Sequence, residues 1–247
     1  MKFTKLVGSM IAANLLAVSG AYATNGMLME GYGPVGASMG GASMAYDNGT
    51  AAMANNPATL GLMQSGTSRL DLAIGGLHPD VVSKMNGMPN ADSEGTAYYM
   101  PAIGWAGKSG ALTYGIGVFA QGGMGTEYGD SSFLGMGTGK NIRTEVSVGN
   151  LILPLAFDVT PDLTIGGSMS LVWGGMDLQM AMSSAQMGAL AAGGNLSATG
   201  MGAAALPSFM GSASNVGYFD FSNSSDFSGE ANSLGWSGKL GVVYKAT

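Results

Sequence analysis

Two short motifs near the N-terminus have the spacing of a catalytic loop and of a nucleotide-binding loop. Residues 36–40 read GASMG, a G-x-S-x-G pattern that in hydrolases presents a nucleophilic serine, here Ser38. Such a serine needs a histidine base, and the only histidine, His78, stands before Pro79 in an expected loop. Residues 31–36, GYGPVG, match G-x-G-x-x-G but lack the preceding strand that a dinucleotide fold requires. We therefore expect no catalytic residues and no enzyme activity.

Metal, cofactor and nucleic-acid sites are also not indicated. The chain has no cysteine and one histidine, and Asp92 and Glu94 are interpreted as solvated loop residues, so we expect no metal and no cofactor. The formal net charge is −6, and a nucleic-acid partner would require a basic surface. We expect no nucleic acid to bind.

The N-terminus predicts export. Lys2 and Lys5 precede an apolar segment, residues 6–18, which ends in an A-x-A pattern at residues 21–23. This is typical of a cleaved signal peptide, predicted over residues 1–23. Charged residues make up only 10% of the chain, whereas about 25% is usual. A surface that does not face water everywhere is indicated.

From residue 66 onward the sequence alternates with the period of a β-strand. In DLTIGGSMSLVWG, residues 162–174, large apolar residues occupy one face while Thr164, Gly166, Ser168 and Ser170 occupy the other. Six strands are predicted, at residues 66–76, 97–107, 111–121, 142–158, 162–176 and 234–245. The fold class is all-β.

Alternation of this kind is typical of two architectures, a soluble β-sandwich and an outer-membrane β-barrel. The strands have about the 9–11 residues that cross a bilayer at a tilt, and their second face is glycine, serine and threonine with few charges. Both features favour a transmembrane antiparallel β-barrel. Six strands would leave two unpaired edges in lipid, so we interpret the chain as the first part of a larger barrel.

The order of the motifs resembles a known family. GYGPVGASMGGASMAYDNGTAAMANNPATLG, residues 31–61, is followed by LHPDV, YGIGVFAQGGMGTEYGD and LGWSGKLGVVY. This series resembles the outer-membrane long-chain fatty acid and hydrocarbon transporters of the FadL/TodX type. The resemblance implies a barrel of about fourteen strands closed by a small-residue hatch, here residues 24–64, with residues 65–247 as the first half of the wall. Its implied hatch motif is Asp47, Asn56, Pro57 and Ala58.

The resemblance also implies a route for the ligand: capture by extracellular loops, an interior pocket, and exit sideways through a kinked strand. The implied kink is Gln121, Gly122 and Gly123. The predicted extracellular loop, residues 175–233, with a helix at 183–192, carries the candidate capture residues Met180, Met182, Met187, Leu190, Leu206, Phe209 and Met210. These side chains either bind ligand or pack the loop, and the sequence leaves both open.

The expected function is passive uptake of long-chain fatty acids or similar hydrophobic compounds. Met180 stands where a matching transporter would offer an arginine to a carboxylate, so a neutral hydrocarbon is an alternative substrate. The implied partners are a hydrophobic ligand, outer-membrane lipid, and the export and barrel-assembly machinery, with a monomer when complete. A general aqueous porin and an exported structural or adhesive β-protein are the competing hypotheses.

Overall fold

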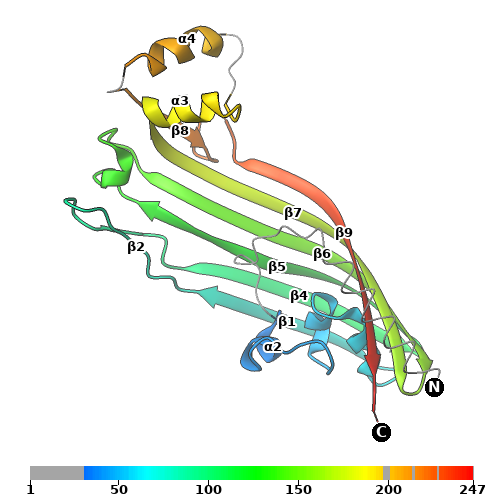
Figure 1. Ribbon diagram of the computed structural model, residues 1–247. Helices are drawn as coiled ribbons and strands as arrows, with labels where there is room; N and C mark the ends of the chain where they lie inside the picture. Colours follow the sequence, from blue (N-terminus) through cyan, green and yellow to red (C-terminus); the bar gives the residue numbers. More distant parts are fainter. Residues whose placement is uncertain (1–30, 197–200, 213–214, 227, 247) are drawn as a thin grey trace, which may run out of the picture.

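The computed structural model describes residues 31–196, 201–212, 215–226 and 228–246, so the predicted signal peptide lies outside the described residues. One antiparallel sheet of seven strands dominates it (Figure 1). Neighbouring strands run in the order β1 (Ser68–Leu77), β4 (Tyr98–Ser109), β5 (Leu112–Tyr128), β6 (Ile142–Thr160) and β7 (Leu163–Ser183). β7 then pairs with β8 (Val216–Phe221) near its end and with β9 (Ala231–Tyr244) along the rest. A separate hairpin joins β2 (Val82–Ser83) and β3 (Ala91–Asp92).

The sheet is open and its apolar face points outward. Leu72 on β1 is 72% exposed and Leu240 on β9 is 92% exposed, whereas Phe119 on β5 is 2% exposed on the opposite face. Along β7 the prediction of two faces is confirmed, because Thr164, Ser168 and Ser170 are buried while Ile165, Met169 and Trp173 are exposed. A sheet with its small residues inside and its large apolar residues outside has the pattern of a barrel wall in lipid.

The predicted strands are found, and two of them are longer than expected. Turns of two residues join β4 to β5 and β6 to β7, the second at Pro161 and Asp162 as the sequence indicated. The predicted loop 175–233 is wrong at both ends, because β7 continues to Ser183 and β9 begins at Ala231. The strand β8, which lies within residues 175–233, was not predicted. Its sequence VGYFDF alternates only weakly, and its strand hydrogen bonds are made with β7.

Two helices cover the end of the sheet where β7 ends and β8 begins (Figure 1). α3 (Ser184–Ala192) begins at a capping box in which the Ser183 hydroxyl accepts from the Gln186 N–H, close to the predicted start. α4 is Met201–Met210, and a short 3-10 helix, η4 (Phe133–Gly135), lies in the β5–β6 connection. Among the described residues, no helix has the length and hydropathy needed to span a membrane.

Residues 31–64, called here the N-terminal segment, lie against the buried face of the sheet. The segment contains α2 (Pro34–Ser38) and the 3-10 helices η2 (Gly49–Met53) and η3 (Pro57–Leu62). Its buried side chains form one core with residues of β4, β5 and β6: Tyr32, Ala52, Met53, Ala54, Leu60, Met63, Ala106, Phe119, Ile152 and Ala156. The small inner residues of the strands therefore make room for a second layer of chain.

Candidate functional site

The wall of the sheet is incomplete between β4 and β5. Their pairing begins at Ser109↔Leu112 and ends at Ala102↔Phe119, although both strands continue. Beyond that point β4 pairs only with β1, up to Leu77↔Tyr98, and β5 pairs only with β6, up to Tyr128↔Ile142. Residues 98–101 of β4 and 120–128 of β5 are thus not paired with each other.

A β-bulge lies at the point of separation. The β5–β6 register shifts between Ala120 and Gly122, which leaves Gln121 as an extra residue on β5. The Asn150 side-chain amide on β6 donates to the side-chain oxygen Oε1 of Gln121. The sequence predicted a kink at Gln121, Gly122 and Gly123, and the bulge occurs at these residues.

A cavity of about 550 Å³ occupies the separation. Its walls come from the unpaired part of β4, from the bulge, and from β6 behind it, and include Tyr99, Met100, Pro101, Ala120, Gly122, Gly123, Ser147, Val148 and Trp173. A side chain at Gly123 would place its Cβ 3.0 Å from the Val146 carbonyl oxygen, so there is little spare room beside the strand. Glycine at this position lets β5 lie close to the backbone of β6 beside the bulge.

The N-terminal segment is anchored through Asn56-Pro57-Ala58, the end of the sequence motif. The Asn56 side-chain oxygen accepts from the Ala58 N–H at 3.1 Å, which caps η3. Its amide nitrogen donates to the Met44 carbonyl at 2.7 Å and to the Val242 carbonyl of β9 at 3.1 Å. One side chain therefore joins two parts of the segment to the wall.

Two glycines that face each other in the sheet leave the space that Asn56 and Ala58 occupy. Gly166 of β7 and Gly241 of β9 are direct partners in the ladder. A Cβ at Gly166 would lie 2.5 Å from the Ala58 nitrogen, and one at Gly241 would lie 1.9 Å from the Asn56 side-chain oxygen. Any other residue at either position would collide with the anchor.

Two lysines hold the same end of the segment. The Lys108 ammonium of β4 is buried, donates to the Gly61 carbonyl and forms a 2.6 Å ion pair with Asp158 of β6. The Lys239 ammonium of β9 donates to the Ala54 carbonyl. Neither lysine was predicted as a site residue, although the strand alternation places both on the inner face.

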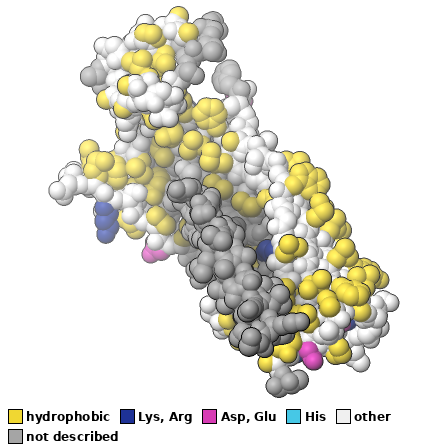
Figure 2. Space-filling view, turned by 45° about the vertical axis from the view of Figure 1, so that its right-hand side comes forward, with side chains coloured by type: hydrophobic (Ala, Val, Ile, Leu, Met, Phe, Trp, Pro, Cys, Tyr) yellow, Lys and Arg dark blue, Asp and Glu magenta, His cyan; other side chains and the backbone are white. Residues whose placement is uncertain are grey.

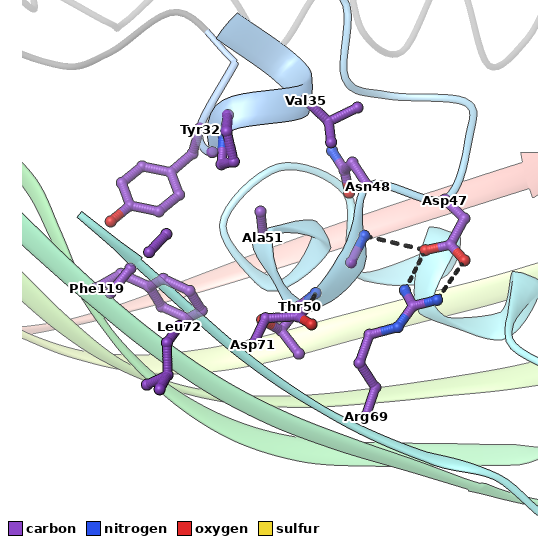
Figure 3. A pocket seen from close by; sticks show the side chains of 15 residues that line it. Tyr32, Val35, Asp47, Asn48, Thr50, Ala51, Arg69, Asp71, Leu72 and Phe119 are labelled. Atoms are coloured by element: carbon purple, nitrogen blue, oxygen red, sulfur yellow. Dashed lines mark hydrogen bonds and ion pairs between the residues drawn. The ribbon is translucent and has the colours of Figure 1, made fainter. Parts of the chain in front are cut away.

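The part of the segment around Asp47, called here its front, lies beside a cavity of about 410 Å³ (Figure 3). Asp47 pairs with Arg69 of β1 through bonds of 2.6 and 3.0 Å, and also accepts from the Gly49 N–H at 3.0 Å. The hydrogen bond from Arg69 lowers the pKa of Asp47, against the opposing effect of burial. Asp71 of β1 accepts from the Thr50 N–H at 2.7 Å.

The predicted capture residues lie together at the α3–α4 end, but they are not equally available. Met187 on α3 is buried, and Leu190, Leu206, Phe209 and Met210 are half-buried on the two helices. Met180 and Met182 belong to β7, paired with Phe219 and Gly217 of β8, and not to a loop. Met187 packs the helices, and the half-buried side chains leave apolar surface at this end, where hydrophobic side chains gather in Figure 2.

Ser38 of the G-x-S-x-G motif and His78 do not form a hydrogen-bonded pair in the structure. Ser38 is exposed in α2 and its hydroxyl donates to the Val35 carbonyl, while His78 lies edge-on to Tyr99. Among the described residues there is no group of three or more metal-ligating side chains.

Comparisons with known proteins agree with this geometry. The structure matches the toluene transporter TodX of Pseudomonas putida at 33% identity and a TM-score of 0.76, over 88% of this chain and 53% of that one. It matches the toluene transporter TbuX of Ralstonia pickettii at 33% identity and a TM-score of 0.71, over 88% and 54%. The monoaromatic hydrocarbon channel CymD has the same fold at 23% identity, with a TM-score of 0.65 over 92% and 51%.

Sequence comparison adds one shorter match. A Chlorobium limicola protein, described as an uncharacterized protein in the 5′ region of the phosphoenolpyruvate carboxykinase gene, is 51% identical over 74 residues, 30% of this chain and 36% of that protein. No family model matches the chain. The chain spans about half the length of the solved transporters that it matches. At 33% identity over 88% of its residues, the chain is similar in sequence and in fold to these solved transporters of the FadL/TodX type.

Proposed function

We propose that this protein takes up hydrophobic small molecules across the outer membrane, with neutral monoaromatic hydrocarbons as the favoured substrates. The observation that carries the proposal is the separation of β4 from β5, with its bulge at Gln121 and its cavity. A closed antiparallel wall has no such break, because every ladder bond that is lost in lipid costs free energy. A break flanked by glycines therefore supports a lateral exit from the barrel interior into the membrane.

The surrounding surface supports a location in the bilayer. Large apolar side chains of β1, β6, β7 and β9 are exposed. Figure 2 shows hydrophobic side chains along the right-hand edge of the molecule. Outer-membrane lipid is the partner that matches this face. The N-terminal segment is then the hatch, and export by the predicted signal peptide with assembly by the barrel machinery is part of the proposal.

The charged side chains favour a neutral ligand over a fatty acid. Three basic residues of the strands are already in ion pairs: Lys108 with Asp158, Arg69 with Asp47, and Arg143 with Glu145. Lys239 donates to a hatch carbonyl. Met180, where a matching transporter would offer an arginine, pairs with Phe219. TodX and TbuX are toluene transporters, in agreement with this choice.

Transport needs no covalent step in this proposal. Burial of apolar surface contributes about 25 cal/mol per Å², so a hydrocarbon gains free energy at the α3–α4 surface, in the interior, and finally in lipid. Leu190, Leu206, Phe209 and Met210 are the proposed capture residues, since they are half-buried, with Met180 and Met182 beside them on β7. Met187 is assigned to packing.

The test is uptake by the membrane-assembled protein. Cells that express it are expected to accumulate radiolabelled toluene faster than cells without it, and to show a smaller effect for radiolabelled oleate. Faster oleate than toluene uptake would reverse the substrate assignment. Liposome swelling in small sugars without toluene uptake would instead identify a general porin, and no transport of any of the three would favour a structural or adhesive protein.

A further inference from the structure

The Ala120 carbonyl lies where the ladder between β4 and β5 stops. The last pair is Ala102↔Phe119, so a continued ladder would place Ala120 opposite Pro101. Proline has no backbone N–H, so Pro101 cannot donate to any carbonyl across the strand gap. The next residue on β5 is the bulged Gln121. The sequence thus removes the donor at the point where the wall separates.

A side chain of the hatch supplies a donor to this carbonyl. The Tyr32 hydroxyl donates to the Ala120 carbonyl at 2.9 Å, a contact that spans 88 residues of sequence. The Tyr32 ring meets the Phe119 ring edge-on, with centroids 5.4 Å apart and planes at 86°. Figure 3 shows the two rings side by side above the sheet. The hatch therefore reaches the bulge from inside the barrel.

Tyr32 is itself held in place by the anchored part of the hatch. Its backbone N–H donates to the Asn55 side-chain oxygen at 2.8 Å, and its carbonyl accepts from the Asn55 amide nitrogen at 2.8 Å. Asn55 is buried and precedes the anchor residue Asn56. Burial raises the pKa of Tyr32 to about 12, so the phenol keeps its proton at neutral pH and remains a donor. A continuous series of contacts leads from the anchor to the bulge.

We propose that Tyr32 is a positioning residue of the lateral exit: its hydroxyl replaces the ladder donor that Pro101 lacks, and so keeps β4 and β5 apart. The inference rests on the proposed function and names a residue that sets the width of its exit. A carbonyl without a donor at this depth is costly, and β5 would shift towards another donor. With the hydroxyl present the gap can stay open without that cost.

The first experiment compares two tyrosine-to-phenylalanine variants of the membrane-assembled protein. Tyr32→Phe removes the hydroxyl at the bulge, and we expect toluene uptake to fall about tenfold, the size expected when one buried acceptor loses its donor. Tyr46→Phe is the matched control, because the Tyr46 hydroxyl donates to Ala42 within the hatch itself. We expect it to transport like the unaltered protein.

A second variant separates positioning from folding. Pro101→Ala gives β4 an N–H at the site of the gap. Combined with Tyr32→Phe, it is expected to restore the thermal stability lost in Tyr32→Phe while uptake stays low, since the ladder now extends and the gap closes. A purely structural role for Tyr32 predicts that uptake returns together with stability.

Spin labels can measure the gap directly, because the chain has no cysteine of its own. Tyr99→Cys on β4 and Ser147→Cys on β6 are exposed sites on either side of β5 at the cavity. Leu155→Cys and Leu240→Cys flank β7 in an unbroken ladder and serve as the control pair. In the Tyr32→Phe background the first distance is expected to shorten and the second to stay constant.

The outcomes distinguish this inference from the proposed function. Full toluene uptake by Tyr32→Phe, an unchanged distance between the labels at residues 99 and 147, or an equal loss in Tyr46→Phe would overturn the role of Tyr32 and leave the transport proposal intact. Absence of toluene uptake by the unaltered protein would contradict the proposed function itself. The distance measurement does not depend on transport and still tests the effect of Tyr32 on the gap.

Discussion

The two sides of this half-barrel treat the hatch differently. On β7 and β9 the strands pair without a break from Leu163↔Tyr244 to Met176↔Ala231, and the hatch is seated on them through Asn56, with Gly166 and Gly241 beneath it. On β4 and β5 the ladder stops at Phe119, and the hatch reaches the wall through the Tyr32 hydroxyl. The continuous ladder of β7 and β9 holds the hatch in place. Where the ladder between β4 and β5 stops, the hatch instead donates a hydrogen bond to the Ala120 carbonyl. The same segment is thus an anchor on one side and a spacer on the other.

The largest effect is expected where the anchor has no space. Gly241→Val would force a side chain into the position of the Asn56 side-chain oxygen. Overpacking of this kind costs about 3 kcal/mol, and here it would displace the hatch. We expect a lower temperature for the heat-induced shift on gels, and liposomes that become permeable to small sugars.

Gly235→Val is the matched control for that variant. Gly235 lies on β9 six residues earlier, on the same face, with open space where its Cβ would be. It should keep the gel shift and sugar exclusion of the unaltered protein. Equal leakage in both variants would contradict the idea that the anchor depends on the Gly166–Gly241 pair.

The broken side gives the second prediction. Replacing Gly122 and Gly123 with valine fills the cavity between β4 and β5, so toluene uptake should fall at least tenfold, about 1.4 kcal/mol in the barrier to passage. Assembly should persist, because β5 and β6 stay paired on both sides of the bulge. Gly167→Val, on the outer face of the unbroken β7, is the control and should transport normally. Normal toluene uptake by the double valine variant would contradict a lateral exit at this bulge.

The sequence predicted the strands because their alternation is local. A residue such as Leu72 or Ser168 shows its face by its neighbours two positions away, and the bulge was marked by consecutive glycines. Asn56 was predicted from a motif, and its cap on Ala58 is a local interaction. These features needed no knowledge of distant contacts.

The remaining features depend on contacts between distant residues. The contact of Tyr32 with Ala120 joins residues 88 positions apart, and Lys239 meets Ala54 across 185. The alternation of β9 places Lys239 on the inner face but does not identify its partner, and Tyr32 lies outside the alternating strands. The sequence could have predicted a missing ladder donor at Pro101, because proline inside a strand has no backbone N–H. Which neighbouring strand loses that hydrogen bond follows only from the register.

The smallest effect is expected at the front of the hatch, where Asp47 meets Arg69. Each side chain is 36% exposed, so solvent screens the pair and its contribution to the free energy of unfolding should be below about 1 kcal/mol.

The pKa of Asp47 is lower in the folded protein than its ordinary value, mainly through the Arg69 hydrogen bond. The pair therefore stabilises the fold above the ordinary carboxyl pKa, and this contribution is lost as the pH falls through the lowered value. Asp47→Asn should unfold slightly earlier than the unaltered protein at pH 7, and the difference in unfolding temperature should vanish in acid. A large loss at pH 7 would mean that the front of the hatch is anchored as firmly as Asn56, and the difference between the two sides of the barrel would then lie in the wall alone.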